Sequence, residues 1–101
     1  MNQPCSPGSA LDGNQVSTKE RIAQVPKGLY LHGCLYGGVI KRSKTVQYST
    51  FRSEDGRWRL GRWYWSRTKS FEMYSDESWA TPLDAAVALH RGGVSFLREF
   101  L

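Results

Sequence analysis

The residues best suited to binding chemistry lie in residues 56–67, which hold three of the four tryptophans and four arginines. Arginine guanidinium groups bind phosphates and base edges, and the face of an aromatic ring stacks on an unpaired base. The same residue types dominate the energetic centres of protein–protein contacts. This stretch therefore predicts a binding surface and leaves the class of its partner open.

The pattern of this stretch indicates a β-strand. Aromatic residues favour strands, and the Asp55-Gly56 pair in front of it is typical of a hairpin turn. Because side chains alternate along a strand, an unbroken strand places Trp58 and Leu60 on one face. The opposite face then carries Arg57, Arg59, Trp63 and Trp65.

A second register arises if Gly61 forms a β-bulge. The extra residue turns Trp63 and Trp65 inward, beside Trp58 and Leu60. The outer face then carries Arg57, Arg59, Arg62 and Tyr64. We favour the bulged register, because it exposes no tryptophan and because a glycine within a strand often marks a bulge.

The positive charge is concentrated in the middle of the chain. The formal net charge is +5, and residues 1–40 contribute +1, residues 41–69 contribute +7 and residues 70–101 contribute −3. A positive region of this kind steers polyanions toward it. Lysines and arginines at strand edges also keep sheets from pairing with other molecules, so both uses of the charge are compatible with the sequence.

Composition divides the chain into a tail and one small domain. Residues 1–25 are rich in Ser, Gly, Asn, Gln and Pro and form no apolar face, so we expect a disordered tail with a helical turn at residues 19–24. Residues 26–101 are enough for one small sheet with a helix across it. We expect strands at residues 29–42, as one strand or two, and at residues 45–52, 56–67 and 70–74.

Residues 81–93 carry the signals of a helix. Thr81 is a capping residue, Pro82 suits the first helical position and Asp84 lies near the positive end of the helix dipole. Gly92-Gly93 supplies the stop. We expect an α+β domain in which a three- to four-stranded antiparallel sheet packs on this C-terminal helix. Residues 94–101 fit a second short helix, and its apolar residues are Phe96, Leu97, Phe100 and Leu101.

Residues for catalysis or metal binding are sparse. The two cysteines, Cys5 and Cys34, make no disulfide framework, and they leave too few ligands for a closed zinc site even with His32 and His90. His32 and Cys34 lie on the same side of a strand, but the sequence offers no third group to orient the histidine. The chain also lacks a phosphate-binding glycine loop. We expect no enzyme activity, no metal and no cofactor.

The cellular location of the protein is predicted from two kinds of segment, a transmembrane helix and a secretory signal. No run approaches the ~20 apolar residues of a transmembrane helix, and residues 1–13 lack the pattern of a secretory signal. With the sparse cysteines, this favours the cytoplasm and no membrane partner.

Several short motifs are spaced along the middle of the chain. They are Tyr36-Gly37-Gly38-Val39-Ile40-Lys41-Arg42, Phe51-Arg52, Leu60-Gly61, and Ala85-Ala86 with Ala88 after Thr81. Together they resemble the AP2-type DNA-binding domain and its relatives in phage integrases. The resemblance implies a three-stranded sheet on one helix, with the sheet in the major groove and with DNA contacts from Arg42, Arg52 and either Arg59 or Arg62. That family runs from Leu-Gly to its helix within a few residues, whereas here residues 62–80 intervene.

We predict that the region between Lys41 and Arg67 binds nucleic acid through a basic, aromatic sheet face. The bulged register favours duplex DNA, and the unbroken register suits single strands or RNA, with Trp63 and Trp65 as stacking platforms. The expected binding residues are Lys41, Arg42, Lys44, Arg52, Arg57, Arg59, Arg62, Tyr64 and Arg67. The alternative is a small interaction, accessory or inhibitor protein, such as one from a mobile element. It would bind an acidic protein or self-associate through the four apolar residues at the C-terminal end.

Overall fold

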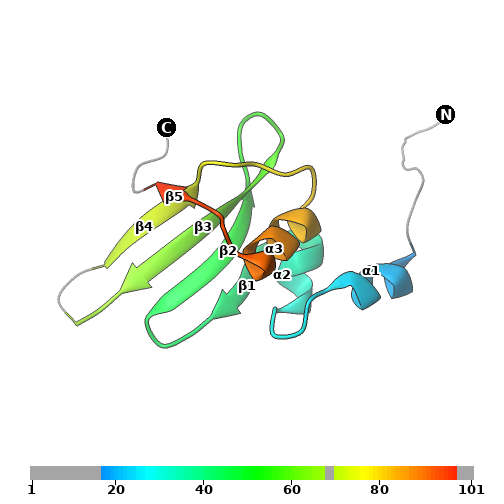
Figure 1. The fold of residues 1–101 in the computed structure, drawn as a ribbon, viewed down its shortest axis with the longest axis horizontal. Coiled ribbons are helices and arrows are strands. Elements are labelled where there is room, and N and C mark those ends of the chain that lie inside the picture. The colour runs from blue at the N-terminus through cyan, green and yellow to red at the C-terminus, as the bar shows by residue number, and fades with distance from the viewer. Residues whose placement is uncertain (1–16, 68–69, 98–101) are drawn as a thin grey trace.

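The computed structural model describes residues 17–67 and 70–97. Figure 1 shows a meander of strands with two short helices against one of its sides. The elements are α1 (Thr18–Gln24), α2 (Leu31–Tyr36), β1 (Gly38–Arg42), β2 (Val46–Arg52), β3 (Trp58–Trp65), β4 (Ser70–Ser75), α3 (Pro82–Arg91) and β5 (Phe96–Leu97).

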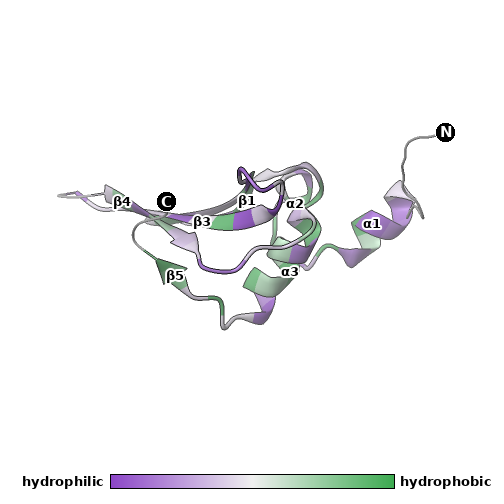
Figure 2. Ribbon diagram, turned by 90° about the horizontal axis from the view of Figure 1, so that it is seen from above, coloured by the Kyte–Doolittle hydropathy of each residue, from purple (hydrophilic) through white to green (hydrophobic). Residues whose placement is uncertain are grey.

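The strands form one antiparallel sheet in the order β1-β2-β3-β4-β5, so each strand pairs with its neighbour in sequence. Helices α2 and α3 lie on the same side of this sheet (Figure 2). We call this the helix side, and the opposite surface of the sheet the open face, because no described helix covers it. The predicted α+β class is confirmed, and the described sheet has five strands where three or four were expected.

The core lies between the sheet and the two helices. Ile40 of β1 and Leu60 of β3 are fully buried there, together with Cys34 of α2 and Ala85 and Ala86 of α3. The small alanine side chains allow α3 to approach the sheet closely. The core is small because the helices cover only part of the helix side.

The predicted C-terminal helix is present as α3. Thr81 caps it, since the Thr81 side-chain oxygen accepts a hydrogen bond from the Asp84 amide at 3.1 Å. Pro82 occupies the start of the helix, and Gly92 ends it with a φ of 85°. These signals are local in sequence, which is why the sequence specifies this element well.

Residues 31–36 form helix α2, so the predicted strand over residues 29–42 is wrong in its first half. The chain turns between α2 and β1 at Gly37 and Gly38, whose φ angles are 91° and 113°. Gly33 then packs directly on β1, and a Cβ at this position would lie 2.0 Å from the Val39 carbonyl oxygen. Contact between α2 and β1 therefore overrides the strand preference of these residues.

The C-terminal end also differs from the prediction. Phe96 and Leu97 pair with β4 as β5 instead of forming a second helix. Gly92 and Gly93, both with positive φ, lead the chain back toward the sheet, where the Phe96 ring lies 5.9 Å from that of Tyr48. The helix and the self-association surface predicted at Phe100 and Leu101 lie outside the described residues.

The predicted tail is only partly within the described residues. Residues 18–24 form α1, capped by the Ser17 side chain, in agreement with the helical turn expected at residues 19–24. The disorder expected for residues 1–16 lies outside the described part. None of the helices in residues 17–67 and 70–97 is long and apolar enough to cross a membrane.

Candidate nucleic-acid interface

Strand β3 runs without a bulge at Gly61, so the favoured bulged register is wrong and the unbroken one is present. Gly61 pairs with Ser49 of β2 and with Tyr74 of β4 in a continuous ladder. The shift of register lies in β1 instead, between Val39 and Lys41.

Two residues expected on the outer face find partners on the helix side. The Arg62 guanidinium carbon lies 6.0 Å from the centroid of the Tyr48 ring, within the range of a cation–π contact. The Tyr64 ring lies 5.0 Å from the ring of Phe71. These contacts hold Arg62 and Tyr64 away from the open face and leave Trp63 on it, 41% exposed.

The open face is an ordered set of cross-strand rows. Trp63 lies between Gln47 and Glu72, and Gly61 lies between Ser49 and Tyr74. Partners across an antiparallel pair project from the same face. Trp63 therefore shares its face with side chains from three strands.

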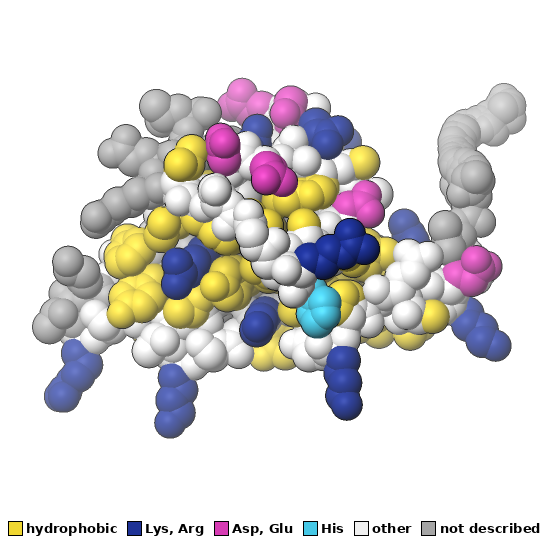
Figure 3. All heavy atoms as spheres, in the orientation of Figure 1, with side chains coloured by type: hydrophobic (Ala, Val, Ile, Leu, Met, Phe, Trp, Pro, Cys, Tyr) yellow, Lys and Arg dark blue, Asp and Glu magenta, His cyan; other side chains and the backbone are white. Residues whose placement is uncertain are grey.

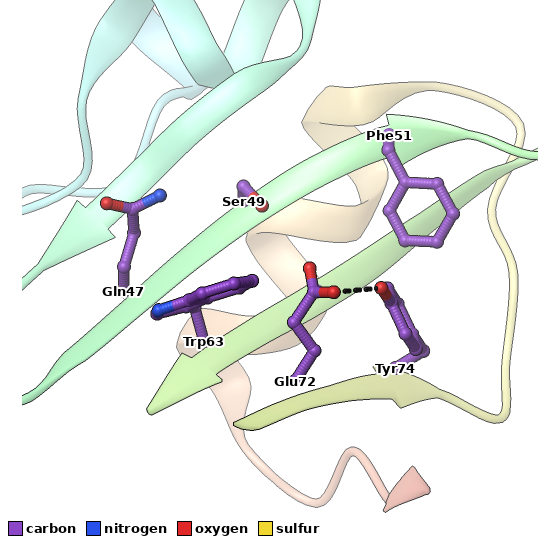
Figure 4. A pocket seen from close by; sticks show the side chains of 7 residues that line it. Gln47, Ser49, Phe51, Trp63, Glu72 and Tyr74 are labelled. Atoms are coloured by element: carbon purple, nitrogen blue, oxygen red, sulfur yellow. Dashed lines mark hydrogen bonds between the residues drawn. The ribbon is translucent and has the colours of Figure 1, made fainter. Parts of the chain in front are cut away.

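A hollow of about 350 Å³ opens at the centre of this face, within the size range of small-ligand sites. Gly61 contributes no side chain to it, and a Cβ there would lie 3.4 Å from the Ser49 hydroxyl oxygen. Figure 4 shows the Trp63 indole nearly edge-on along one side, with the Phe51 and Tyr74 rings on the other. The hollow is lined by Gln47, Ser49, Phe51, Gly61, Trp63, Glu72 and Tyr74.

A carboxylate is held in place at this hollow. The Tyr74 hydroxyl donates a hydrogen bond of 2.6 Å to Glu72 Oε1, drawn as a dashed line in Figure 4. This bond raises the pKa of Tyr74, because ionising the phenol would break it and set two negative charges side by side. The Phe51 ring packs edge-on against Tyr74, with centroids 5.3 Å apart. Tyr74 thus stays a protonated donor that orients Glu72.

Positive charge gathers at one end of the open face. Arg42 pairs with Gln47 and shares its face. The Trp65 amide donates to the Thr45 carbonyl at 3.0 Å, which brings the turn that carries Lys44 beside the end of β3, just before Arg67. All three basic residues are exposed. Figure 3, which looks onto the helix side, shows Lys and Arg side chains standing out from the lower edge of the molecule, while most acidic side chains gather toward the upper one.

The other predicted arginines lie at the opposite end of the sheet and make hydrogen bonds within the protein. Arg57 donates to the Ser78 hydroxyl at 2.8 Å, and Arg59 donates to the Asp76 carbonyl at 3.0 Å. Arg52 Nε donates to the Gly56 carbonyl at 3.3 Å. These bonds tie the ends of β2 and β3 to the neighbouring turns.

The nine predicted binding residues are therefore divided between surfaces. Lys41 faces the helix side, where it lines a hollow with Lys27 and His90, and Arg62 and Tyr64 lie on that side too. Arg42 and Arg59 lie on the open face, Lys44 and Arg67 lie beyond its basic end, and Arg52 and Arg57 lie near its other end.

Five residues of the hollow were missed by sequence reasoning. They are Gln47, Ser49, Phe51, Glu72 and Tyr74. Strand alternation was the signal that could have found them, once β3 was taken as unbroken and paired on both sides.

Cys34 and His32 are not placed as a nucleophile and base pair. Helix α2 buries Cys34 completely and exposes His32, so the two do not share a face as the predicted strand required. Burial raises the pKa of the Cys34 thiol, which disfavours the nucleophilic thiolate. Within residues 17–67 and 70–97, no group of three or more His, Cys, Asp or Glu residues is placed to hold a metal ion.

Comparison with known proteins adds no family to this description. No family model matches the chain, and neither the curated proteins nor the solved structures contain a significant match.

Proposed function

We propose that this protein binds single-stranded nucleic acid on the open face of its sheet. The observation that carries the proposal is Trp63, an indole 41% exposed beside a hollow on a sheet face that no described helix covers. An unpaired base stacks on such a ring, and this contact is available to any base sequence.

The basic end of the face supplies contacts for the phosphate backbone. Arg42 lies two strands from Trp63, because Arg42 pairs with Gln47 and Gln47 pairs with Trp63. At ordinary strand spacing this separation is ~10 Å. A strand of nucleic acid that crosses the sheet would meet Arg42 and then the side chains of Lys44 and Arg67.

Single strands suit this face better than duplex DNA. The bases of a duplex already stack on one another, so Trp63 would find no free base face to contact. Duplex DNA was favoured for the register that turns both tryptophans inward, and β3 does not adopt it. The sparse cysteines are typical of a reducing compartment, so we further propose that this binding occurs in the cytoplasm.

The test compares labelled single-stranded DNA, duplex DNA and polyphosphate across a salt series. The native chain should bind the single strand most tightly. We expect log K for single-stranded DNA to fall with the logarithm of the salt concentration. Changing Arg42, Lys44 and Arg67 together to alanine should make this fall shallower by about 2 units of slope, because each lost phosphate contact removes ~0.7.

The matched control removes three exposed positive charges away from the open face, by Lys19→Ala, Lys27→Ala and Arg91→Ala. This variant should keep most of the salt slope. Equal binding of all three polyanions, or an equal loss in both variants, would contradict the proposal. Complete absence of binding would leave the face to a protein partner, for which exposed tryptophan and arginine are equally suited.

A further inference from the structure

We infer that the hollow above Gly61 selects guanine among the bases of a single strand. The base would stack on Trp63, and its N1–H and N2 amino groups would donate to the Glu72 carboxylate. This inference rests on the proposed function and adds base specificity to it.

The first argument is the charge of Glu72. It is the one acidic side chain within strands β1 to β5 as described, and it lies on the face proposed to bind a polyanion. A carboxylate there repels phosphates and weakens binding that depends on charge alone. Its position is explained if it accepts hydrogen bonds from a base.

The second argument is the position of the carboxylate. Glu72 is the direct cross-strand partner of Trp63, and such partners lie ~5 Å apart at Cβ. Figure 4 shows the Glu72 carboxylate between the Trp63 indole and the Tyr74 ring. The hydrogen bond from Tyr74 orients the carboxylate and uses one lone pair of Glu72 Oε1, which leaves the other lone pair of Oε1 and both of Oε2 to accept from a ligand. A base stacked on Trp63 would therefore present its edge to a carboxylate that is already oriented.

The third argument is the shape of the hollow. Gly61 leaves the floor of the hollow without a side chain, and the Phe51 and Tyr74 rings lie beyond one end of the Trp63 indole, at 76° to each other. A planar base stacked on Trp63 would therefore have room above Gly61, with two further aromatic rings at one border of the hollow. Gln47, on the other side of Trp63 from Glu72, adds an amide that can donate to an acceptor on another edge of the base, such as N7 of guanine.

Hydrogen-bond chemistry separates guanine from the other bases. A carboxylate only accepts, and its two oxygens match two parallel donors. Guanine offers two adjacent donors on one edge, whereas cytosine and adenine offer an amino group beside a ring nitrogen that accepts. Thymine and uracil offer one N–H between two carbonyl oxygens, which the carboxylate repels. Guanine should therefore bind best, and thymine or uracil worst.

The test uses an oligothymidine, the same strand with one central guanosine, and the same strand with inosine, which lacks the N2 amino group, at that position. The native chain should prefer the guanosine strand over oligothymidine by about 5- to 150-fold, the usual range for a good bidentate contact. Inosine should fall between them.

The matched variant is Glu72→Gln, which keeps the size of the side chain and removes the charge. It should bind the guanosine strand and oligothymidine within about twofold of each other, and it should bind oligothymidine at least as tightly as the native chain, because a repulsive charge is gone. Equal affinities of the native chain for all three strands would overturn the guanine pocket and leave the proposed function standing. Failure of the native chain to bind any strand would overturn both. A guanine preference unchanged in Glu72→Gln would show that another group reads the base.

Discussion

Changing Trp63 to alanine should weaken binding of single-stranded DNA by about 5- to 150-fold, since stacking of one base on an aromatic ring contributes ~1–3 kcal/mol. The loss should be similar for every base sequence that lacks guanine, because each base has an aromatic face. Trp63 is partly exposed and stands outside the buried core, so the variant should keep its fold. Fluorescence anisotropy of a labelled oligothymidine measures the affinity.

Two variants make this result specific. Trp63→Phe keeps an aromatic face and should retain most of the affinity. Tyr36→Ala removes a ring that is 58% exposed but lies on α2, away from the open face, and it should bind as the native chain does. Unchanged affinity in Trp63→Ala, with its fold intact, would exclude the open face as the stacking surface.

Changing Gly33 to alanine should destabilise the protein by ~3 kcal/mol or more, at the upper end of the range for overpacking. The added Cβ would lie 2.0 Å from the Val39 carbonyl oxygen and 2.8 Å from Ile40 Cγ2. The first contact is with backbone, so α2 would have to move away from β1 and open the core at Ile40. The Gly33 carbonyl also accepts a 3.3 Å hydrogen bond from the Thr50 hydroxyl, which such a movement would strain. Urea unfolding followed by tryptophan fluorescence measures the free energy.

Gly28→Ala is the matched control. Gly28 has a φ of 93°, yet a Cβ there would meet nothing within 4 Å. It should therefore cost ~1–2 kcal/mol, from backbone conformation alone. Equal destabilisation by the two substitutions would mean that the close approach of α2 to β1 does not limit stability.

Elements specified by neighbouring residues could be predicted from the sequence. Thr81, Pro82 and Gly92 define both ends of α3, and alternating side chains with an Asp-Gly turn indicate β2 and β3. The α+β class follows from these elements. Each of these predictions uses residues that are close in sequence and does not depend on the pairing of the strands.

Features that depend on distant contacts could not be predicted. Helix α2 requires Gly33 to meet β1, and the register of β3 requires Tyr48 and Phe71 to be present beside Arg62 and Tyr64. The bulge was favoured because it hides every tryptophan, a rule suited to a stable core. On a surface that binds a partner, an exposed tryptophan is expected, so the rule that tryptophans are buried fails there.

In the candidate site, too, residues close together in sequence were recognised, whereas neighbours that come from distant strands were not. Residues 56–67 drew attention to Trp63 and to Arg67, but the partners of Trp63 in space come from two other strands. Glu72 and Gln47 are separated from each other by 25 positions in sequence and become neighbours of one ring only through the pairing of β3 on both sides. Arg57 and Arg62 drew the same attention, although they bond or pack within the protein.

The most direct measurement is an NMR titration of the tryptophan indole N–H signals with single-stranded DNA. We predict that the Trp63 signal shifts as binding saturates. The signals of Trp58 and Trp79 should stay in place, because neither residue lines the hollow and the two form an isolated bridge through two 2.7 Å backbone hydrogen bonds. Saturable binding that leaves the Trp63 signal unmoved, or that shifts only Trp58 and Trp79, would contradict binding at the open face.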